Sequence, residues 1–155
     1  MYAIGDLIFG AQLAHTASAQ GIQVAEQLAG KEVSVDVNVV PGCVYTDPEI
    51  ASVGITEDEA KEKGIAVKVG KFIMSANGKS LITKEERGFI KIVAEEESGM
   101  IVGAQMMCAR ATDMIGEFVT AVANKLTVSQ LLNGMRAHPT YNEGIGEALE
   151  ELEGG

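Results

Sequence analysis

The sequence has no tryptophan, and phenylalanine and tyrosine together make up only 5% of its 155 residues. A buried core must therefore be built mainly from aliphatic side chains and methionine. The hydrophobic share of 46% is ordinary for a soluble globular domain. No apolar run reaches the roughly 18 residues that a membrane-spanning helix needs. No basic residue precedes the apolar start of the chain, so we expect neither a membrane segment nor a signal peptide.

Basic residues are scarce, because 12 Lys and Arg stand against 22 Asp and Glu, a formal net charge of −10. Nucleic acids and anionic membrane surfaces select proteins with a basic face, so we exclude both as partners. The acidic residues gather in short runs, which we interpret as solvated helix faces and turns rather than partner sites. These runs lie at 57–62, 85–86, 95–97 and 147–153.

Cysteine is also rare, and Cys43 and Cys108 lie far apart in the sequence without a Cys-x-x-Cys pair. Two isolated cysteines suit buried thiols in a reducing compartment, and we expect a cytoplasmic protein. The two histidines and two cysteines show no zinc-ligand spacing, so no metal site is predicted.

The first 30 residues have the pattern of half an α/β unit. Residues 2–6 predict a short buried strand ending at Gly5-Asp6, and the pattern from about Gln12 to Leu28 predicts a helix that stops at Gly30. A strand that opens a chain and feeds a helix suggests that the chain begins inside a larger protein. The alternative is an edge strand in an independent fold.

From Lys31 on, β-branched residues and turn signals predict several strands. We expect one or two strands broken at Pro41-Gly42 with a turn at Asp47-Pro48, an alternating strand at 65–74, a turn at Asn77-Gly78, and a hairpin over 89–108. Helices are expected near 56–63, 111–126, 127–135 and from about Thr140 to Leu152. Strands followed by helices predict an α+β domain, an antiparallel sheet with helices packed on one side.

Three of these helices begin with a Thr-x-x-Glu/Gln pattern typical of a capping box: Thr56/Glu59, Thr127/Gln130 and Thr140/Glu143. The third follows His138-Pro139, which gives it two interpretations. Capping alone explains Thr140 and Glu143. A fold of the His-Pro corner would instead bring His138 to Glu143. A carboxylate beside an imidazole raises the imidazole's pKa and fixes its tautomer, which suits acid–base catalysis.

Asp6 is the second candidate, because an acid at the end of a strand and before a helix lies where open α/β sheets bind ligands. It could accept hydrogen bonds from sugar or ribityl hydroxyls, and the helix N-terminus beyond it offers N–H groups to a phosphate. A turn-capping role for Asp6 is the simpler interpretation. His15 has the same ambiguity, because a histidine in a helix is usually packed or solvated.

Three blocks together resemble one known family. The segments AIGDLIFGAQLAHTASAQG, VYTDPEIASVGITEDEAKEKG and AHPTYNEGIGEAL are similar, in order and spacing, to the C-terminal part of the dihydrolipoamide dehydrogenases. These enzymes are FAD-dependent pyridine nucleotide-disulfide oxidoreductases. The resemblance covers nearly the whole chain. It implies that residues 1–30 are the last strand and helix of a flavin-binding domain and that residues 31–155 are the interface, or dimerisation, domain.

The resemblance also implies roles for single residues. His138 would be the acid–base catalyst, Glu143 its orienting acid, and the His138-Pro139 bond cis. In the family this histidine acts across a homodimer on the thiols of dihydrolipoamide, near the partner's redox disulfide, and electrons pass through FAD to NAD. Asp6 would bind the ribityl chain of FAD. The residues along the isoalloxazine ring would be Gln12, Leu13, Ala14 and His15.

Two departures from the family pattern stand out. Arg136 occupies the place where the family often has a first histidine, and the redox cysteine pair, the flavin phosphate loop and the NAD domain are missing. We therefore expect a piece of a longer enzyme that binds no cofactor tightly and is inactive alone. Its parent would serve lipoyl-bearing 2-oxoacid dehydrogenase or glycine cleavage components. The alternatives are a glutathione or mercuric reductase, or a dimerisation module without enzymatic ancestry.

Overall fold

The computed structural model describes residues 1–154 of the chain. It divides into two compact parts, Met1–Val40 and the residues from Pro41 on, and each is described here by itself.

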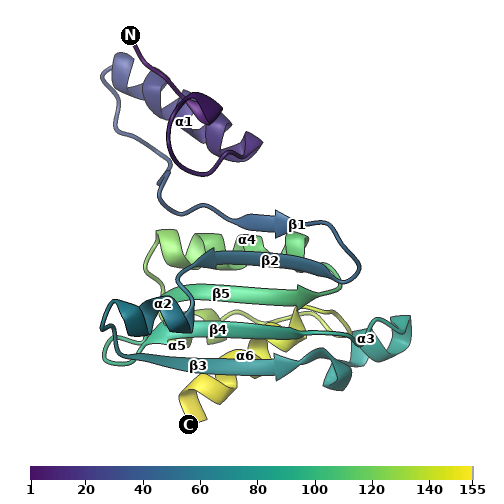
Figure 1. Cartoon of the computed structure of the whole chain (residues 1–155). Helices are drawn as coiled ribbons and strands as arrows, with labels where there is room; N and C mark the ends of the chain where they lie inside the picture. The colour runs from purple at the N-terminus through teal and green to yellow at the C-terminus, as the bar shows by residue number, and fades with distance from the viewer. Residues whose placement is uncertain (155) are drawn as a thin grey trace. The chain divides into compact units, whose positions relative to one another are not determined.

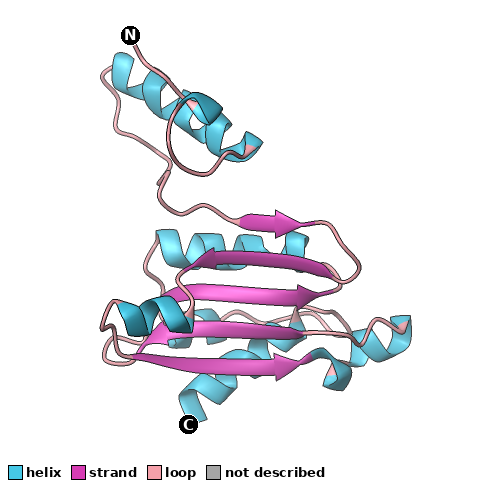
Figure 2. Cartoon of the chain, in the orientation of Figure 1, coloured by secondary structure: helices cyan, strands magenta, loops and turns pink. Residues whose placement is uncertain are grey.

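The second part is built on a five-stranded sheet, in which every neighbouring pair of strands is antiparallel (Figures 1 and 2). The strand order is β1-β2-β5-β4-β3. The strands are β1 (Gly42–Val44), β2 (Glu49–Gly54), β3 (Val67–Ile73), β4 (Phe89–Glu95) and β5 (Ile101–Cys108). The predicted hairpin over 89–108 is β4-β5, and the alternating strand is β3. The turn at Asp47-Pro48 joins β1 to β2, whereas residues 33–39 form no strand.

Three helices cover one face of this sheet. α4 (Ala111–Ala123) packs on β2 and β5, α6 (Glu143–Gly154) packs on β3 and β4, and α5 (Val128–Leu132) packs on α6. The strand residues beneath them are fully buried and lie opposite one another in the register, with Met106 paired to both Ala51 and Ile90. The core is therefore a single layer of aliphatic side chains closed by Phe118, Ile145 and Leu149. The predicted α+β class is confirmed.

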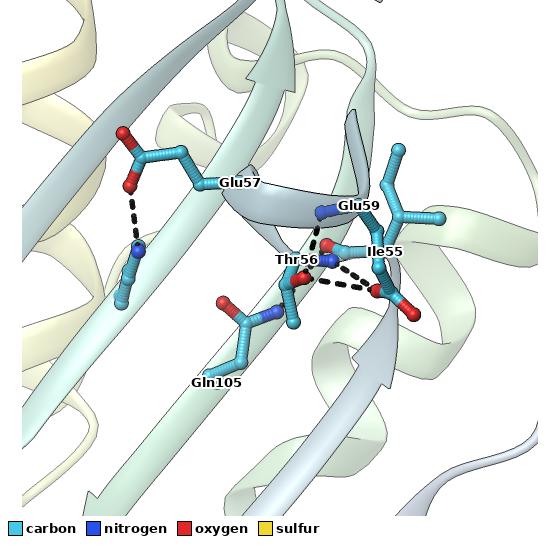
Figure 3. Close-up of polar contacts among 6 residues, drawn as sticks. Ile55, Thr56, Glu57, Glu59 and Gln105 are labelled. Atoms are coloured by element: carbon cyan, nitrogen blue, oxygen red, sulfur yellow. Dashed lines mark hydrogen bonds and ion pairs between the residues drawn. The ribbon is translucent and has the colours of Figure 1, made fainter. Parts of the chain in front are cut away.

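The short helix α2 (Glu57–Glu62) is held from the opposite face of the sheet (Figure 3). Its N-terminus has the predicted capping box, because Thr56 and Glu59 exchange side-chain and backbone hydrogen bonds. Nζ of Lys91 on β4 lies 2.7 Å from the carboxylate of Glu57, and Gln105 on β5 donates to the carbonyl of Ile55 at 3.3 Å. Lys91 and Gln105 are opposite each other in the register, so they tie α2 to the two central strands.

The first part contains a 3-10 turn (η1, Gly5–Leu7) and the helix α1 (Ala14–Leu28). The predicted strand over residues 2–6 is wrong, since Tyr2 and Ile4 are exposed and residues 1–40 contain no strand with which it could pair. An extended segment becomes a strand only when its backbone groups find a neighbour. The helix is confirmed, and Gly30 at a φ of +67° follows its end.

Two local predictions in the second part are also wrong. Asn77-Gly78 is not a simple turn, because Asn77 caps the helix α3 (Gly78–Thr83), which follows a 3-10 turn (η2, Met74–Ala76). The last helix begins at Glu143 rather than near Thr140, since residues 138–142 form bends and turns. Asn77 also donates a hydrogen bond to the carbonyl of Thr140, in the segment that precedes α6.

Candidate active site

His138 and Glu143 are brought together by the loop that joins α5 to α6. Nδ1 of His138 lies 2.7 Å from Oε1 of Glu143, which is the first residue of α6. The His138-Pro139 bond is cis, as is Asp47-Pro48. The imidazole is 78% exposed, and Glu143 is its only hydrogen-bond partner among residues 1–154. The ring is therefore oriented through Nδ1, while Nε2 has no hydrogen-bond partner among residues 1–154.

The carboxylate of Glu143 divides its two oxygens between two partners. Oε2 accepts the backbone N–H of Thr140 at 2.8 Å, while Oε1 contacts the imidazole. Two hydrogen bonds hold the pKa of Glu143 below its ordinary value of 4.5. The one from the backbone of Thr140 has the largest effect, and the one from His138 has the next largest. An ionised carboxylate only accepts hydrogen bonds, so Nδ1 of His138 carries the proton. In the neutral ring, Nε2 is then the basic nitrogen.

The expected third capping box is only half formed. Glu143 accepts from the backbone of Thr140, but the hydroxyl of Thr140 donates to the carbonyl of Ala137 at 2.6 Å instead of accepting from the N–H of Glu143. In the complete box of α2, one oxygen of Glu59 accepts both the N–H and the hydroxyl of Thr56. In both helices the threonine contacts use one carboxylate oxygen, and at Glu143 the second oxygen contacts His138.

Side chains from the segment around α3 hold the loop from one side. Asn77 is 3% exposed, donates from Nδ2 to the carbonyl of Thr140 at 3.1 Å, and accepts the N–H of Ser80 at 2.9 Å. The hydroxyl of Tyr141 lies 2.7 Å from that of Thr83 and donates to Glu85. Burial and the bond to Glu85 raise the pKa of Tyr141, so it stays a neutral donor. Neither anchor was predicted, because a residue pattern gives no signal for contacts across about 60 positions.

The residues expected to touch a flavin lie in the first part of the chain. Asp6 and Gln12 line one open pocket of about 250 Å³, together with residues 7–10. Leu13 precedes α1 and offers no side-chain cap, and Ala14 and His15 open the helix without lining that pocket. The pocket thus joins two of the five predicted residues.

The cysteines offer no second reactive site. Cys108 is fully buried, and burial with a smaller effect of Glu49 raises its pKa to about 12. The pKa of the half-buried Cys43 is raised for the same reasons. Both thiols are free and stay protonated at neutral pH, so they are poor nucleophiles. Within residues 1–154, no three His, Cys, Asp or Glu side chains gather as a metal site.

No helix in residues 1–154 is both long and apolar enough to cross a membrane.

Comparison with known proteins assigns the chain to one family. The model of the pyridine nucleotide-disulphide oxidoreductase dimerisation domain matches residues 40–149. A dihydrolipoyl dehydrogenase of Bacillus subtilis (strain 168) is 46% identical over 155 residues, which cover 99% of this chain and 33% of that protein. A leghemoglobin reductase of Glycine max is 41% identical over 148 residues, 96% of this chain and 28% of that protein.

The crystal structure of LpdA from Mycobacterium tuberculosis superposes with a TM-score of 0.92 at 28% identity, over 97% of this chain and 33% of that one. The chain spans about a third of the length of the curated relatives it matches. The family model covers both His138 and Glu143, whereas Asp6 and residues 12–15 lie outside it. The chain belongs to the pyridine nucleotide-disulphide oxidoreductases and carries their dimerisation domain.

Proposed function

We propose that the chain is the C-terminal part of a dihydrolipoyl dehydrogenase, which oxidises dihydrolipoamide to lipoamide and reduces NAD. The observation that carries the proposal is the 2.7 Å contact between His138 and Glu143, in a domain whose relatives include several dihydrolipoyl dehydrogenases. Residues 1–30 would complete a flavin-binding domain, and residues 31–155 would form the interface domain.

In this mechanism His138 is the proton acceptor, and Glu143 fixes the orientation and tautomer of its imidazole ring. Nε2 takes the proton of one dihydrolipoamide thiol, and the resulting thiolate becomes the nucleophile. The charge that develops on the ring is stabilised by the ionised carboxylate at Nδ1. The same ring returns a proton in the reverse reaction. General acid–base catalysis of this kind contributes about 10²–10⁴-fold to a rate.

FAD would be held from the first part of the chain. Asp6 would accept hydrogen bonds from the ribityl hydroxyls in the pocket that it shares with Gln12. Backbone groups of Leu13, Ala14 and His15, at the start of α1, would lie along the ring. The bound flavin supplies the transfer of an electron pair between the dithiol–disulfide couple and NAD.

The proposed assembly is a homodimer through the interface domain, in which His138 serves the redox disulfide of the second subunit. The family description as a dimerisation domain supports this arrangement. The reaction partners would be lipoyl-bearing 2-oxoacid dehydrogenase or glycine cleavage components. Two free cysteines support a reducing, cytoplasmic setting.

A chimera tests the proposal directly. In the Bacillus subtilis relative, the segment aligned with this chain is replaced by residues 1–155, and NADH formation from dihydrolipoamide is measured. The chimera should turn over, and His138→Gln should lower the rate by about 10²–10⁴-fold. Flavin absorbance and dimer mass should stay unchanged. Glu147→Gln, on the exposed side of α6, is the matched control. Equal rates for the chimera and its His138→Gln variant would contradict the proposal.

A second candidate is another reductase of the family, which the similarity to a leghemoglobin reductase favours. A chimera that reduces glutathione disulfide or leghemoglobin while leaving lipoamide unchanged would support it. A third alternative is a dimerisation module without enzymatic ancestry. In that case His138→Gln would change the stability of the domain and would leave the NADH-forming rate of the chimera unchanged.

A further inference from the structure

One carboxylate on α4, that of Glu117, holds the His138 loop at two points. Nη2 of Arg136 lies 2.5 Å from Oε1 of Glu117, and Nδ2 of Asn142 lies 3.2 Å from Oε2 of the same residue. Arg136 precedes His138 by two residues, and Asn142 directly precedes Glu143. His138 therefore lies between two residues that are held by the same carboxylate, and Glu143 directly follows the second of them.

We propose that Glu117 is a positioning residue for the His138–Glu143 pair. The inference rests on the proposed acid–base role of His138. The imidazole itself is 78% exposed and has one hydrogen bond, so its direction depends on where the loop backbone and Glu143 are held. The loop between α5 and α6 has no regular backbone pairing of its own. The two-point attachment to α4 adds to the contacts of Asn77 and Tyr141 on the α3 side and holds the loop at Arg136 and Asn142.

Glu117 also orients the guanidinium group of Arg136. The Arg136 side chain is only 11% exposed, and Glu117 is the only carboxylate with which it forms an ion pair among residues 1–154. Its Nη1 donates to the carbonyl of Gly134 at 3.3 Å, and its Nε is buried without a partner. A buried guanidinium that loses its carboxylate must find another, because an unpaired buried charge is costly.

The alternative carboxylates are close by and include Glu143 itself. A polar pocket of about 230 Å³ is lined by Arg136 and by the α6 residues Glu143, Glu147 and Glu150. The stem of Arg136 lies against this helix, since a Cβ on Gly146 would be 3.5 Å from its Cδ. Without Glu117, Arg136 turns toward this acidic wall and competes with the imidazole for Glu143. The ion pair to α4 thus keeps the orienting carboxylate available to His138.

The test measures the imidazole rather than turnover. The 155-residue chain has two histidines, so ¹⁵N-labelled histidine gives two ring systems, which a His15→Gln variant assigns. In the wild type, the long-range ¹H–¹⁵N spectrum at neutral pH should show His138 protonated at Nδ1. Glu117→Ala should abolish this preference and give a mixture of the two tautomers. Adding Arg136→Leu to Glu117→Ala should restore part of it, because the competing cation is gone.

The control is Glu59→Ala, which removes a carboxylate that accepts two hydrogen bonds from Thr56 in the unrelated α2 capping box and should leave His138 unchanged. The isosteric Glu117→Gln serves if Glu117→Ala does not fold, and it should also weaken the preference, since the ion pair is lost. An unchanged His138 spectrum in a folded Glu117 variant overturns the inference. If the chimera is inactive but the His138 imidazole still responds to Glu117→Ala, the proposed enzymatic function is contradicted, whereas the positioning role of Glu117 is supported.

Discussion

Gly70 of β3 and Ala148 of α6 are in direct backbone contact. A Cβ built on Gly70 would lie 2.0 Å from the carbonyl oxygen of Ala148 and 2.8 Å from Cγ of Leu152. No side chain fits between strand and helix at this point. The absence of a side chain at Gly70 therefore sets how closely α6 approaches the sheet, and with it the position of Glu143 at the start of that helix.

Gly70→Ala should accordingly destabilise the domain by pushing α6 away from β3. Overpacking of this kind costs about 1–3 kcal/mol, which urea unfolding followed by circular dichroism measures. Gly78→Ala is the matched control, because a Cβ there meets no atom within 4 Å. The Gly78→Ala variant should be as stable as the wild type or more stable by up to about 1 kcal/mol. Equal stability of Gly70→Ala and Gly78→Ala would show that α6 does not depend on this contact.

The carboxylate of Glu143 should make stability depend on pH. Its pKa is lower in the folded chain than the ordinary 4.5, so the unfolded chain binds the proton more readily. The stabilisation is therefore present in full above about pH 4.5 and is lost as pH falls through the folded pKa. Urea unfolding from pH 7 to pH 3 should show a difference between wild type and Glu143→Gln that disappears on acidification.

The exposed Glu147, four residues further along α6, has no hydrogen bond among residues 1–154 and provides the comparison. The Glu147→Gln variant should follow the wild-type pH profile. A constant difference between wild type and Glu143→Gln across the acid range would contradict the assigned contacts of Glu143.

Asn77 should matter for both stability and the His138 loop, because both ends of its buried amide are used. Asn77→Ala removes the cap of α3 and leaves the carbonyl of Thr140 without its donor. The combined loss is about 2 kcal/mol in the free energy of unfolding. Asn77→Asp keeps an oxygen for the N–H of Ser80 but cannot donate to Thr140. It should therefore preserve α3 while still disturbing the His138 resonances, and identical spectra for Asn77→Asp and wild type would refute the link.

Periodicity and caps predicted most of the second part of the chain. The amphipathic α4 and two complete capping boxes follow from contacts within a few residues, and the hairpin β4-β5 follows from strand alternation on either side of a short turn. A sequence pattern records both kinds of signal. The box at Thr140 is incomplete because its hydroxyl donates to the carbonyl of Ala137 and does not accept the N–H of Glu143. The strand at residues 2–6 failed because pairing needs a second segment that no local pattern supplies.

The candidate site could be predicted only in part for the same reason. The five-residue spacing of His138 and Glu143 permitted their contact, but spacing alone favoured a capping role over a functional pair. The residues that hold them are distant in sequence: Arg136 and Glu117 are 19 positions apart, and Asn77 and Thr140 are 63 apart. Polar residues at such separations have no shared period, and Asn77 followed by glycine has the typical pattern of a turn.

The 155-residue chain should produce no NADH from dihydrolipoamide, FAD and NAD. Oxidising the dithiol requires an acceptor for two electrons, and the chain's own thiols cannot serve as one. Cys43 lies opposite Ala51 and Cys108 opposite Glu49, so the register does not pair them, and both thiols have raised pKa values. Absorbance at the NADH maximum should remain at the level of a protein-free mixture, and a Cys43→Ser, Cys108→Ala variant should behave identically. Sustained NADH production that these substitutions abolish would show that the two cysteines can meet, and it would contradict the strand register that separates them.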